Sequence, residues 1–271
     1  RGQRAGDRGR ATVKLGRVEP QLRSVAATRY VEPLREGGSL PGLMEADDDG
    51  LYVAKYRGAG QGPAALVAEV VVGELARRLG LPVPELVTLG LRAELARAEP
   101  DPEIQDLLYA SAGTNLGVDF LPGALPFTPA AVADIDPELA ADVVWLDALT
   151  TNVDRSPRNP NLLVWHGRTW LIDHGAALFR QHGTRPLAST AHEPFPAIAD
   201  HVLLGAAGPL SEADERLAQT AQAALDTAVA LVPEDWLGES PATRRRDLTD
   251  FLAERLRAPR AFVAEAEAAR A

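Results

Sequence analysis

Strand-type and helix-type sequence patterns occupy different halves of this 271-residue chain. Between residues 24 and 121, short apolar runs alternate with turns rich in Gly and Asp, such as Asp47–Gly50. After residue 129, apolar residues recur at helical spacing in long stretches rich in Ala and Leu. Strands first and helices second predict an α+β fold of two lobes with a cleft between them, and the boundary is expected near residue 123.

One helix is expected among the strands, and one hairpin is expected among the helices. Residues 63–79 carry an apolar stripe at helical spacing, and Gly80 ends that helix. The hairpin joins strand-type runs at 161–165 and 168–172 through a tight His166-Gly167 turn. The other expected elements are strands at 25–31, 43–46, 51–56, 85–91 and 118–121, helix and loop over 93–116, and helices at 137–151, 210–232 and 241–269.

The charge balance limits the classes of partner. The chain has 28 basic and 38 acidic residues, and a net charge of −10 disfavours direct nucleic-acid binding, which needs a basic face. It has no cysteine, which excludes disulfides and thiol nucleophiles and suits a reducing cytoplasm. No apolar run approaches the ~18 residues of a membrane span. We therefore expect a cytoplasmic protein that binds no membrane.

The first 23 residues differ from the rest of the chain. They hold seven basic residues against two acidic ones, and they show little apolar periodicity. Such a composition cannot bury a core, so we expect residues 1–23 to form a disordered basic leader. The remaining chain then divides into an N-lobe at 24–123 and a helical C-lobe at 124–271.

Lysine is scarce, because only Lys14 and Lys55 are lysines among the 28 basic residues. An arginine bias of this strength replaces lysine wherever arginine serves equally well. Lys55 lies in the strand-type sequence Val53-Ala54-Lys55, where a solvated side chain would tolerate arginine. A compact ammonium group that contacts phosphate is not readily replaced by a planar guanidinium. Lys55 is therefore a candidate for specific chemistry.

The strongest chemical pattern lies between residues 152 and 175. Asp154 and Asn159 are five residues apart on a Pro-containing loop between a helix and a strand, and Asp173 follows the hairpin. The hairpin returns this second carboxylate to the first loop.

This arrangement resembles the catalytic core of the protein-kinase-like superfamily. The resemblance implies that Asp154 orients the acceptor hydroxyl and that Asn159 and Asp173 hold Mg²⁺, for which carboxylate and amide oxygens are suitable hard ligands. Asn161 is an alternative to Asn159 as the amide ligand. It also implies that Lys55 contacts the phosphates of ATP.

A carboxylate on the helix at 63–79 would pair with Lys55. Glu69 and Glu74 are the two candidates, and Glu69 is preferred because of its position before Leu75-Ala76-Arg77. Five residues place the two side chains about 140° apart around a helix, so they cannot both serve.

Three stretches are similar to the HipA-like kinases of bacteria. They are Ala68-Glu69 through Leu79-Gly80-Leu81-Pro82-Val83-Pro84, Asn152-Val153-Asp154-Arg155 with Asn159, and Leu171-Ile172-Asp173-His174-Gly175. The last stretch also resembles the Ile-Asp-x-Gly sequence of phosphatidylinositol 3-/4-kinases. The resemblance implies an ATP- and Mg²⁺-dependent kinase that transfers the γ-phosphate to a hydroxyl, most often of Ser or Thr in a protein.

Two nucleotide-binding segments complete the expected site. The resemblance implies a hinge strand at Asp119, Phe120 and Leu121 that holds adenine through backbone groups. The turn with Gly37, Gly38 and Ser39 lies between the first two strands, where a phosphate-covering loop belongs. Two alternatives remain, a pseudokinase that binds nucleotide without transfer and a small-molecule or lipid kinase on the same fold.

Overall fold

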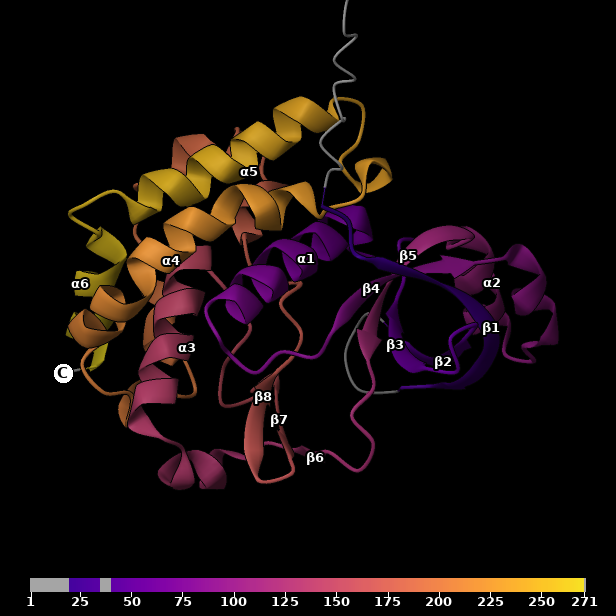
Figure 1. Ribbon diagram of the computed structural model, residues 1–271, viewed down its shortest axis with the longest axis horizontal. Helices are drawn as coiled ribbons and strands as arrows, with labels where there is room; N and C mark the ends of the chain where they lie inside the picture. The colour runs from indigo at the N-terminus through magenta and orange to yellow at the C-terminus, as the bar shows by residue number, and fades with distance from the viewer. Residues whose placement is uncertain (1–19, 35–39, 271) are drawn as a thin grey trace, which may run out of the picture.

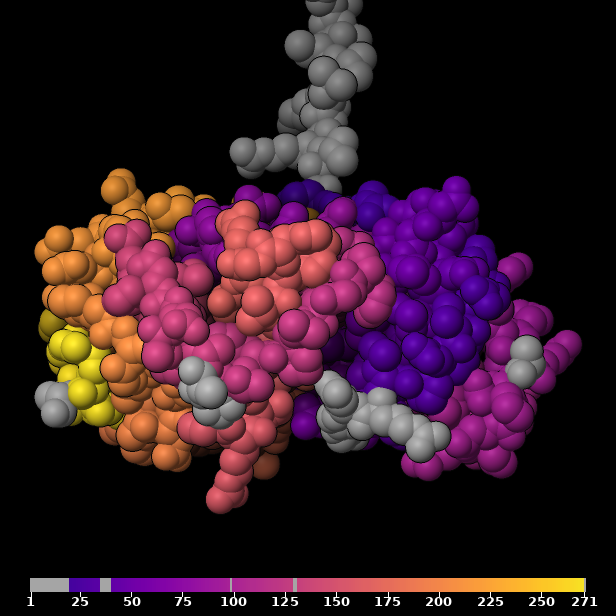
Figure 2. Space-filling view, turned by 90° about the horizontal axis from the view of Figure 1, so that it is seen from below, coloured from indigo at the N-terminus to yellow at the C-terminus, as the bar shows by residue number. Residues whose placement is uncertain are grey.

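The computed structural model describes residues 20–34 and 40–270. These residues form a closed five-stranded barrel, a three-stranded sheet and six α-helices. The barrel lies at one end of the molecule, helices α3 to α6 lie at the other, and α1 lies between them (Figure 1). Figure 2 shows the same division, with indigo and violet residues gathered at one end and orange and yellow residues at the other.

The first and fourth strands along the chain pair with each other, and this pairing closes the barrel. It is parallel, whereas every other pair of neighbouring strands in the barrel is antiparallel. In the order of pairing, its strands are β1 (Arg23–Pro33), β2 (Gly42–Ala46), β3 (Leu51–Lys55), β5 (Gly113–Asp119) and β4 (Leu86–Leu91). Alternate side chains of β3 face different cores. Tyr52 and Ala54 lie in the core of the barrel, and Val53 packs against the core shared with the helices.

The β2–β3 hairpin turns at the Asp-Asp-Asp-Gly segment, as the sequence predicts. Asp49 adopts a left-handed φ of 62°, which Asp tolerates better than most residues. The side chain of Asp48 accepts a hydrogen bond from the Gly50 N–H at 3.1 Å. This local bond stabilises the turn that joins β2 to β3.

Helix α1 (Gly62–Arg78) begins with Pro63 in its first turn and is followed by Gly80 at a φ of 83°. It is buried on nearly every face, because Val70, Val71 and Val72 are each 0% exposed. Its apolar residues belong to the same core as those of α3 and α4. The helix that follows β3 along the chain therefore packs with the second half of the chain.

The remaining helices are α2 (Pro102–Ala110), α3 (Pro137–Thr150), α4 (Leu210–Ala230), α5 (Pro241–Leu256) and α6 (Ala261–Arg270). Asp101 and Asp136 cap α2 and α3, since each carboxylate accepts a hydrogen bond from the N–H two residues later. In the described part of the chain, no helix is long and apolar enough to cross a membrane.

The remaining three strands form a small separate sheet. Its strands are β6 (Leu125–Pro126), β7 (Leu162–Trp165) and β8 (Arg168–Leu171), and the β7–β8 hairpin is the one that the sequence predicts. His166 and Gly167 form its turn with φ values of 48° and 72°. The Leu171 N–H donates to the Pro82 carbonyl, which attaches this hairpin to the segment after α1.

Two predicted elements differ from the structure. The helix expected over 241–269 is interrupted, because residues 257–260 separate α5 from α6 and contain Pro259, which has no N–H to continue a helix. The strand expected at 118–121 begins earlier, at Gly113 in β5. Asn115 is fully buried and bonds the backbone at Arg57 and Ser111, so a polar residue obscures the apolar pattern of this strand.

Candidate active site

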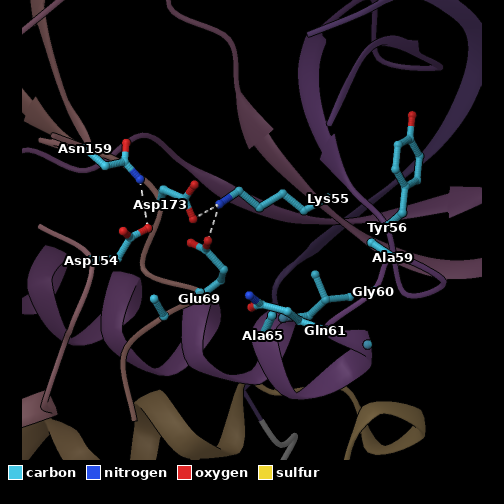
Figure 3. A pocket seen from close by; sticks show the side chains of 14 residues that line it. Lys55, Tyr56, Ala59, Gly60, Gln61, Ala65, Glu69, Asp154, Asn159 and Asp173 are labelled. Atoms are coloured by element: carbon cyan, nitrogen blue, oxygen red, sulfur yellow. Dashed lines mark hydrogen bonds and ion pairs between the residues drawn. The ribbon is translucent and has the colours of Figure 1, made fainter. Parts of the chain in front are cut away.

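Lys55, Glu69 and Asp173 lie together in the wall of one pocket (Figure 3). The Lys55 Nζ at the end of β3 pairs with the Glu69 Oε1 on α1 and donates to the Asp173 Oδ1 at 2.8 Å. Glu69 and Glu74 were the two candidate partners of Lys55 in the sequence, and Glu69 is the one that forms the ion pair. Glu74 instead forms an ion pair with Arg77 at 3.4 Å.

The turn after β8 holds Glu69 in place. The backbone N–H of His174 donates to the Glu69 Oε2 at 3.0 Å, while the other oxygen faces Lys55. Gly175 permits this approach, because a Cβ at that position would lie 3.2 Å from the Glu69 Oε1. A single carboxylate thus joins α1 to both the barrel and the Asp173 turn.

The three charges shift one another's pKa values. Burial disfavours the ammonium of Lys55, but Glu69 and Asp173 outweigh it and raise the pKa of Lys55 to about 12. Burial likewise opposes ionisation of Asp173, yet the neighbouring Lys55 holds the pKa of that carboxyl well below its usual range. Burial raises the pKa of Glu69 above its ordinary value. Lys55 therefore remains a cation at neutral pH.

Asp154 lies on the loop between α3 and β7, where two amides contact it. Its Oδ2 accepts hydrogen bonds from the Asn159 Nδ2 at 2.8 Å and from the Asn161 Nδ2 at 3.3 Å. Asn161 is buried and also donates to the Asp154 carbonyl at 3.0 Å. Asn159 is exposed and lines the same cavity as Asp154, so Asn159 is the amide that a cation could reach.

Three residues other than glycine adopt left-handed backbone conformations around this loop. Thr151, Asn161 and Asp173 have φ values of 52°, 51° and 55°. Such conformations are costly for residues with a Cβ, and they concentrate at functional sites, where the surrounding structure holds them. Here they mark the start and end of the Asp154 loop and the Asp173 turn.

Two cavities share Lys55, Glu69 and Asp173. The larger one, of about 600 Å³, is lined mainly by apolar side chains, and the predicted hinge residues Asp119, Phe120 and Leu121 lie on its wall. The smaller one, of about 200 Å³, adds Asp154, Asn159 and the loop between β3 and α1. The structure therefore brings the predicted metal and catalytic residues together and places the hinge residues in the adjoining cavity.

The predicted phosphate-covering turn at Gly37, Gly38 and Ser39 lies outside the described residues. Leu34 and Pro41, which flank that segment, line the larger cavity.

Two of the three backbone N–H groups of the predicted hinge already donate hydrogen bonds within the protein. The N–H of Asp119 donates to the Glu85 carbonyl at 2.9 Å, and the N–H of Phe120 donates to the Leu51 carbonyl at 3.0 Å. Among residues 20–34 and 40–270, no backbone oxygen accepts from the Leu121 N–H. Of the three predicted hinge residues, which all line the larger cavity, Leu121 is thus the one whose N–H has no backbone partner in the described part of the chain.

Carboxylate and amide oxygens are available for one cation. Within the described ranges, no cluster of three or more His, Cys, Asp or Glu side chains could hold a metal. A protein-bound Mg²⁺ needs fewer, because water and phosphate oxygens complete its shell of six. Asp173 and Asn159 both line the smaller cavity, and together they offer the carboxylate and amide oxygens that a Mg²⁺ ion with few protein ligands needs.

Reasoning from the sequence gave no role to three buried polar residues next to the site, namely Asp147, Arg155 and His201, although Arg155 lies in one of the stretches that resemble the family. Asp147 interrupts the apolar helix α3 between Leu146 and Ala148, and a carboxylate in such a run was the available signal. No spacing rule links Asp147 to His201, which is 54 residues later in the chain.

Comparisons with known proteins bear on the family and the fold. The sequence model of the HipA-like kinase family matches residues 28–260. The structure is similar to the crystal structure of the Helicobacter pylori proinflammatory kinase CtkA, with a TM-score of 0.56 and 13% sequence identity. The similarity covers 91% of this chain and 98% of that one. A search of curated proteins gives no match.

Proposed function

This chain belongs to the HipA-like kinase family, and we propose that it uses ATP and Mg²⁺ to phosphorylate a Ser or Thr hydroxyl of a protein. The observation that carries the proposal is the ion-paired Lys55, Glu69 and Asp173 at the junction of two cavities. Phosphoryl transfer depends on positioned charge more than on covalent chemistry of the protein, and these residues supply that charge.

We assign the two halves of the chain to two lobes, an N-lobe at 24–123 and a C-lobe at 124–271. Support comes from the larger cavity, which β3, β4 and the hinge line on one side and Leu163 and Leu171 of the β7–β8 hairpin line on the other. Its volume of about 600 Å³ and apolar walls suit a purine base and ribose. In this assignment the Leu121 N–H donates to the adenine ring.

The phosphates would extend from this cavity toward Lys55, whose ammonium neutralises their charge. Asp173 and Asn159 would hold Mg²⁺, which supplies electrostatic stabilisation of the transferred phosphoryl group. Asp154 then orients the acceptor hydroxyl in the smaller cavity and accepts its proton. The two amides on the Asp154 Oδ2 restrict its rotation.

The proposal is tested with ATP and with two carboxylate variants. ATP with Mg²⁺ should raise the melting temperature, since a ligand that binds only the folded state stabilises it. Asp173→Asn should weaken Mg²⁺-dependent ATP binding as well as phosphate transfer. Asp154→Asn should bind ATP and Mg²⁺ nearly normally and transfer phosphate about 10³-fold more slowly.

Asp106→Asn serves as the control, because Asp106 is exposed on α2. It should change neither ATP binding nor phosphate transfer. No thermal shift with millimolar ATP and Mg²⁺ would contradict nucleotide binding. A thermal shift without transfer to any protein substrate would point to one of the two alternatives, a nucleotide-binding module without catalysis or a kinase of small molecules or lipids.

A further inference from the structure

We propose that Asp147, Arg155 and His201 form a buried positioning cluster that fixes the Asp154 loop and the Asp173 turn relative to each other. The inference rests on the proposed function, because it assigns a task to residues beside that same site. None of the three lines either cavity, so their role is positioning and not catalysis.

Arg155 contacts both segments that carry a key carboxylate. Its guanidinium, with a side-chain exposure of 0%, donates through Nη1 to the Asn161 carbonyl and, at 3.4 Å, to the Ile172 carbonyl. Asn161 holds Asp154, and Ile172 immediately precedes Asp173. Through Nη2, Arg155 also contacts the His174 Nδ1 at 3.3 Å. One rigid planar group thus spans the loop and the turn.

Asp147 on α3 forms a buried ion pair with Arg155. Its Oδ2 accepts from the Arg155 Nε at 2.5 Å, and its Oδ1 accepts from the Asn152 Nδ2 at 3.0 Å. Although burial opposes ionisation, Arg155 and His201 hold the pKa of Asp147 well below its usual range. The helix is therefore tied to the first residues of the Asp154 loop through a charged carboxylate.

His201 completes the shell of Asp147, and its tautomer follows from its partners. The Leu203 N–H donates to the His201 Nδ1 at 3.1 Å, so the ring proton of a neutral His201 resides on Nε2. That N–H faces the Asp147 Oδ2 at 2.9 Å. The next residue, Val202, donates its N–H to the Arg155 carbonyl at 3.0 Å. The His201 segment thereby fixes both the carboxylate and the arginine.

Such a cluster contributes geometry more than stability. Desolvation of a buried ion pair offsets much of its attraction, so a cluster of apolar residues could stabilise the fold equally well. An apolar cluster, however, could not hydrogen-bond the carbonyls of Asn161 and Ile172, because it has no donors. A displacement of about 1 Å between catalytic groups can slow a reaction about 10²-fold, so fixed geometry has a large kinetic value.

The test compares two substitutions of His201. His201→Gln keeps an amide N–H that can donate to Asp147, whereas His201→Phe removes the donor and keeps an aromatic ring. We expect His201→Phe to lower kcat about 10²-fold while the ATP affinity stays within about two-fold. His201→Gln should restore most of kcat. Leu89→Ala, in the separate barrel core, provides a destabilised control with normal kcat.

Amide hydrogen exchange supplies a readout that needs no activity. In His201→Phe, exchange should become at least about ten-fold faster in both 152–161 and 172–175, and it should match wild type in His201→Gln and Leu89→Ala. Unchanged exchange, or faster exchange in only one segment, would overturn the positioning cluster. The positioning cluster would also be overturned if Leu89→Ala lowers kcat as much as His201→Phe does, because general destabilisation would then explain the loss.

The two proposals fail in different ways. If the wild-type protein transfers no phosphate but both segments loosen together in His201→Phe, the proposed kinase function is wrong and the positioning cluster stands. If the wild-type protein is an active kinase and His201→Phe keeps its kcat, the positioning cluster is wrong and the kinase function stands.

Discussion

The barrel and the helical region are built around separate apolar cores of very different extent. The barrel core is small and closed by its own strands and α2, with Tyr52 and Leu89 among its members. The other core runs from α1 through α3, α4, α5 and α6, and it also receives Leu86, Leu116 and Val118 from the outer face of the barrel. Strands with alternating faces can therefore serve both cores at once.

The comparison shows where the candidate active site lies, which is at the boundary between the two cores. Lys55 comes from a barrel strand, whereas Glu69 belongs to a helix of the larger core and Asp173 follows the hairpin. The cation thus comes from the barrel, and both carboxylates that pair with it come from outside the barrel. The Lys55–Glu69 ion pair joins the barrel to the helical region at this point.

Among the variants that compare the barrel with the helical region, the loss of the Lys55 charge should have the largest effect. In Lys55→Met, phosphate transfer should fall at least about 10²-fold, because a positioned charge in the site is lost. Arg78→Met, which removes an exposed cation on α1, should retain full activity. Steady-state kinetics on both variants checks this expectation. Full activity in a folded Lys55→Met protein would exclude the lysine from the mechanism.

Equivalent deletions in the two cores should separate stability from ligand binding. Leu75→Ala on α1 and Leu89→Ala on β4 each remove a fully buried leucine side chain and should each cost about 2–5 kcal/mol of unfolding free energy. Only Leu75→Ala should also weaken ATP binding, because α1 carries Glu69. Denaturant unfolding and ATP titration measure the two effects. Equal ATP affinities in the two variants would argue against distinct roles for the cores.

A smaller effect is expected where the barrel leads into the helical region. Leu121→Pro removes the hinge N–H and should weaken ATP binding about ten-fold, the value of one good hydrogen bond. Leu121→Ala keeps that N–H and provides the matched control for the lost side chain. Isothermal titration with ATP compares the two variants. If Leu121→Pro binds ATP as well as Leu121→Ala does, another hinge group contacts the base.

The smallest expected effect is a change in how the melting temperature depends on pH, and it arises from His201 in the helical region. Burial lowers the pKa of His201 below its ordinary value, with Asp147 opposing that shift and Arg155 adding to it. The unfolded chain then binds more protons below pH ~6.5, so this histidine contributes stability at neutral pH that is lost as the pH falls. Between pH 7 and pH 5, the melting temperature of His201→Gln should fall less than that of wild type. An identical decline in both proteins would contradict this sign.

Much of this arrangement could be predicted from local patterns. The Asp-rich β2–β3 turn, α1 and the β7–β8 hairpin follow from residues that are close in the sequence. The closure of the barrel does not, because the parallel pairing of β1 with β4 joins residues more than 60 positions apart. The interruption between α5 and α6 was also missed, since alanine-rich sequence continues on both sides of Pro259.

In the candidate site too, the sequence indicates the residues but not the contacts between segments that are far apart in the chain. Lys55, Glu69, Asp154, Asn159 and Asp173 could be selected from their order and spacing, although their catalytic roles remain predictions. The choice between Glu69 and Glu74 required the orientation of α1 against the barrel. The contact between Asp147 and His201 depends on tertiary packing alone, so no local pattern in the sequence could have revealed it.

The burial of α1 has a consequence for how such an enzyme could be switched on and off. A helix that carries the partner of an active-site lysine could in principle swing away and inactivate the enzyme. Here an outward movement would expose Val70, Val71 and Val72, at roughly 1.5–3 kcal/mol for each side chain. It would also break the bond from His174 to Glu69. The burial of α1 therefore disfavours control by helix displacement.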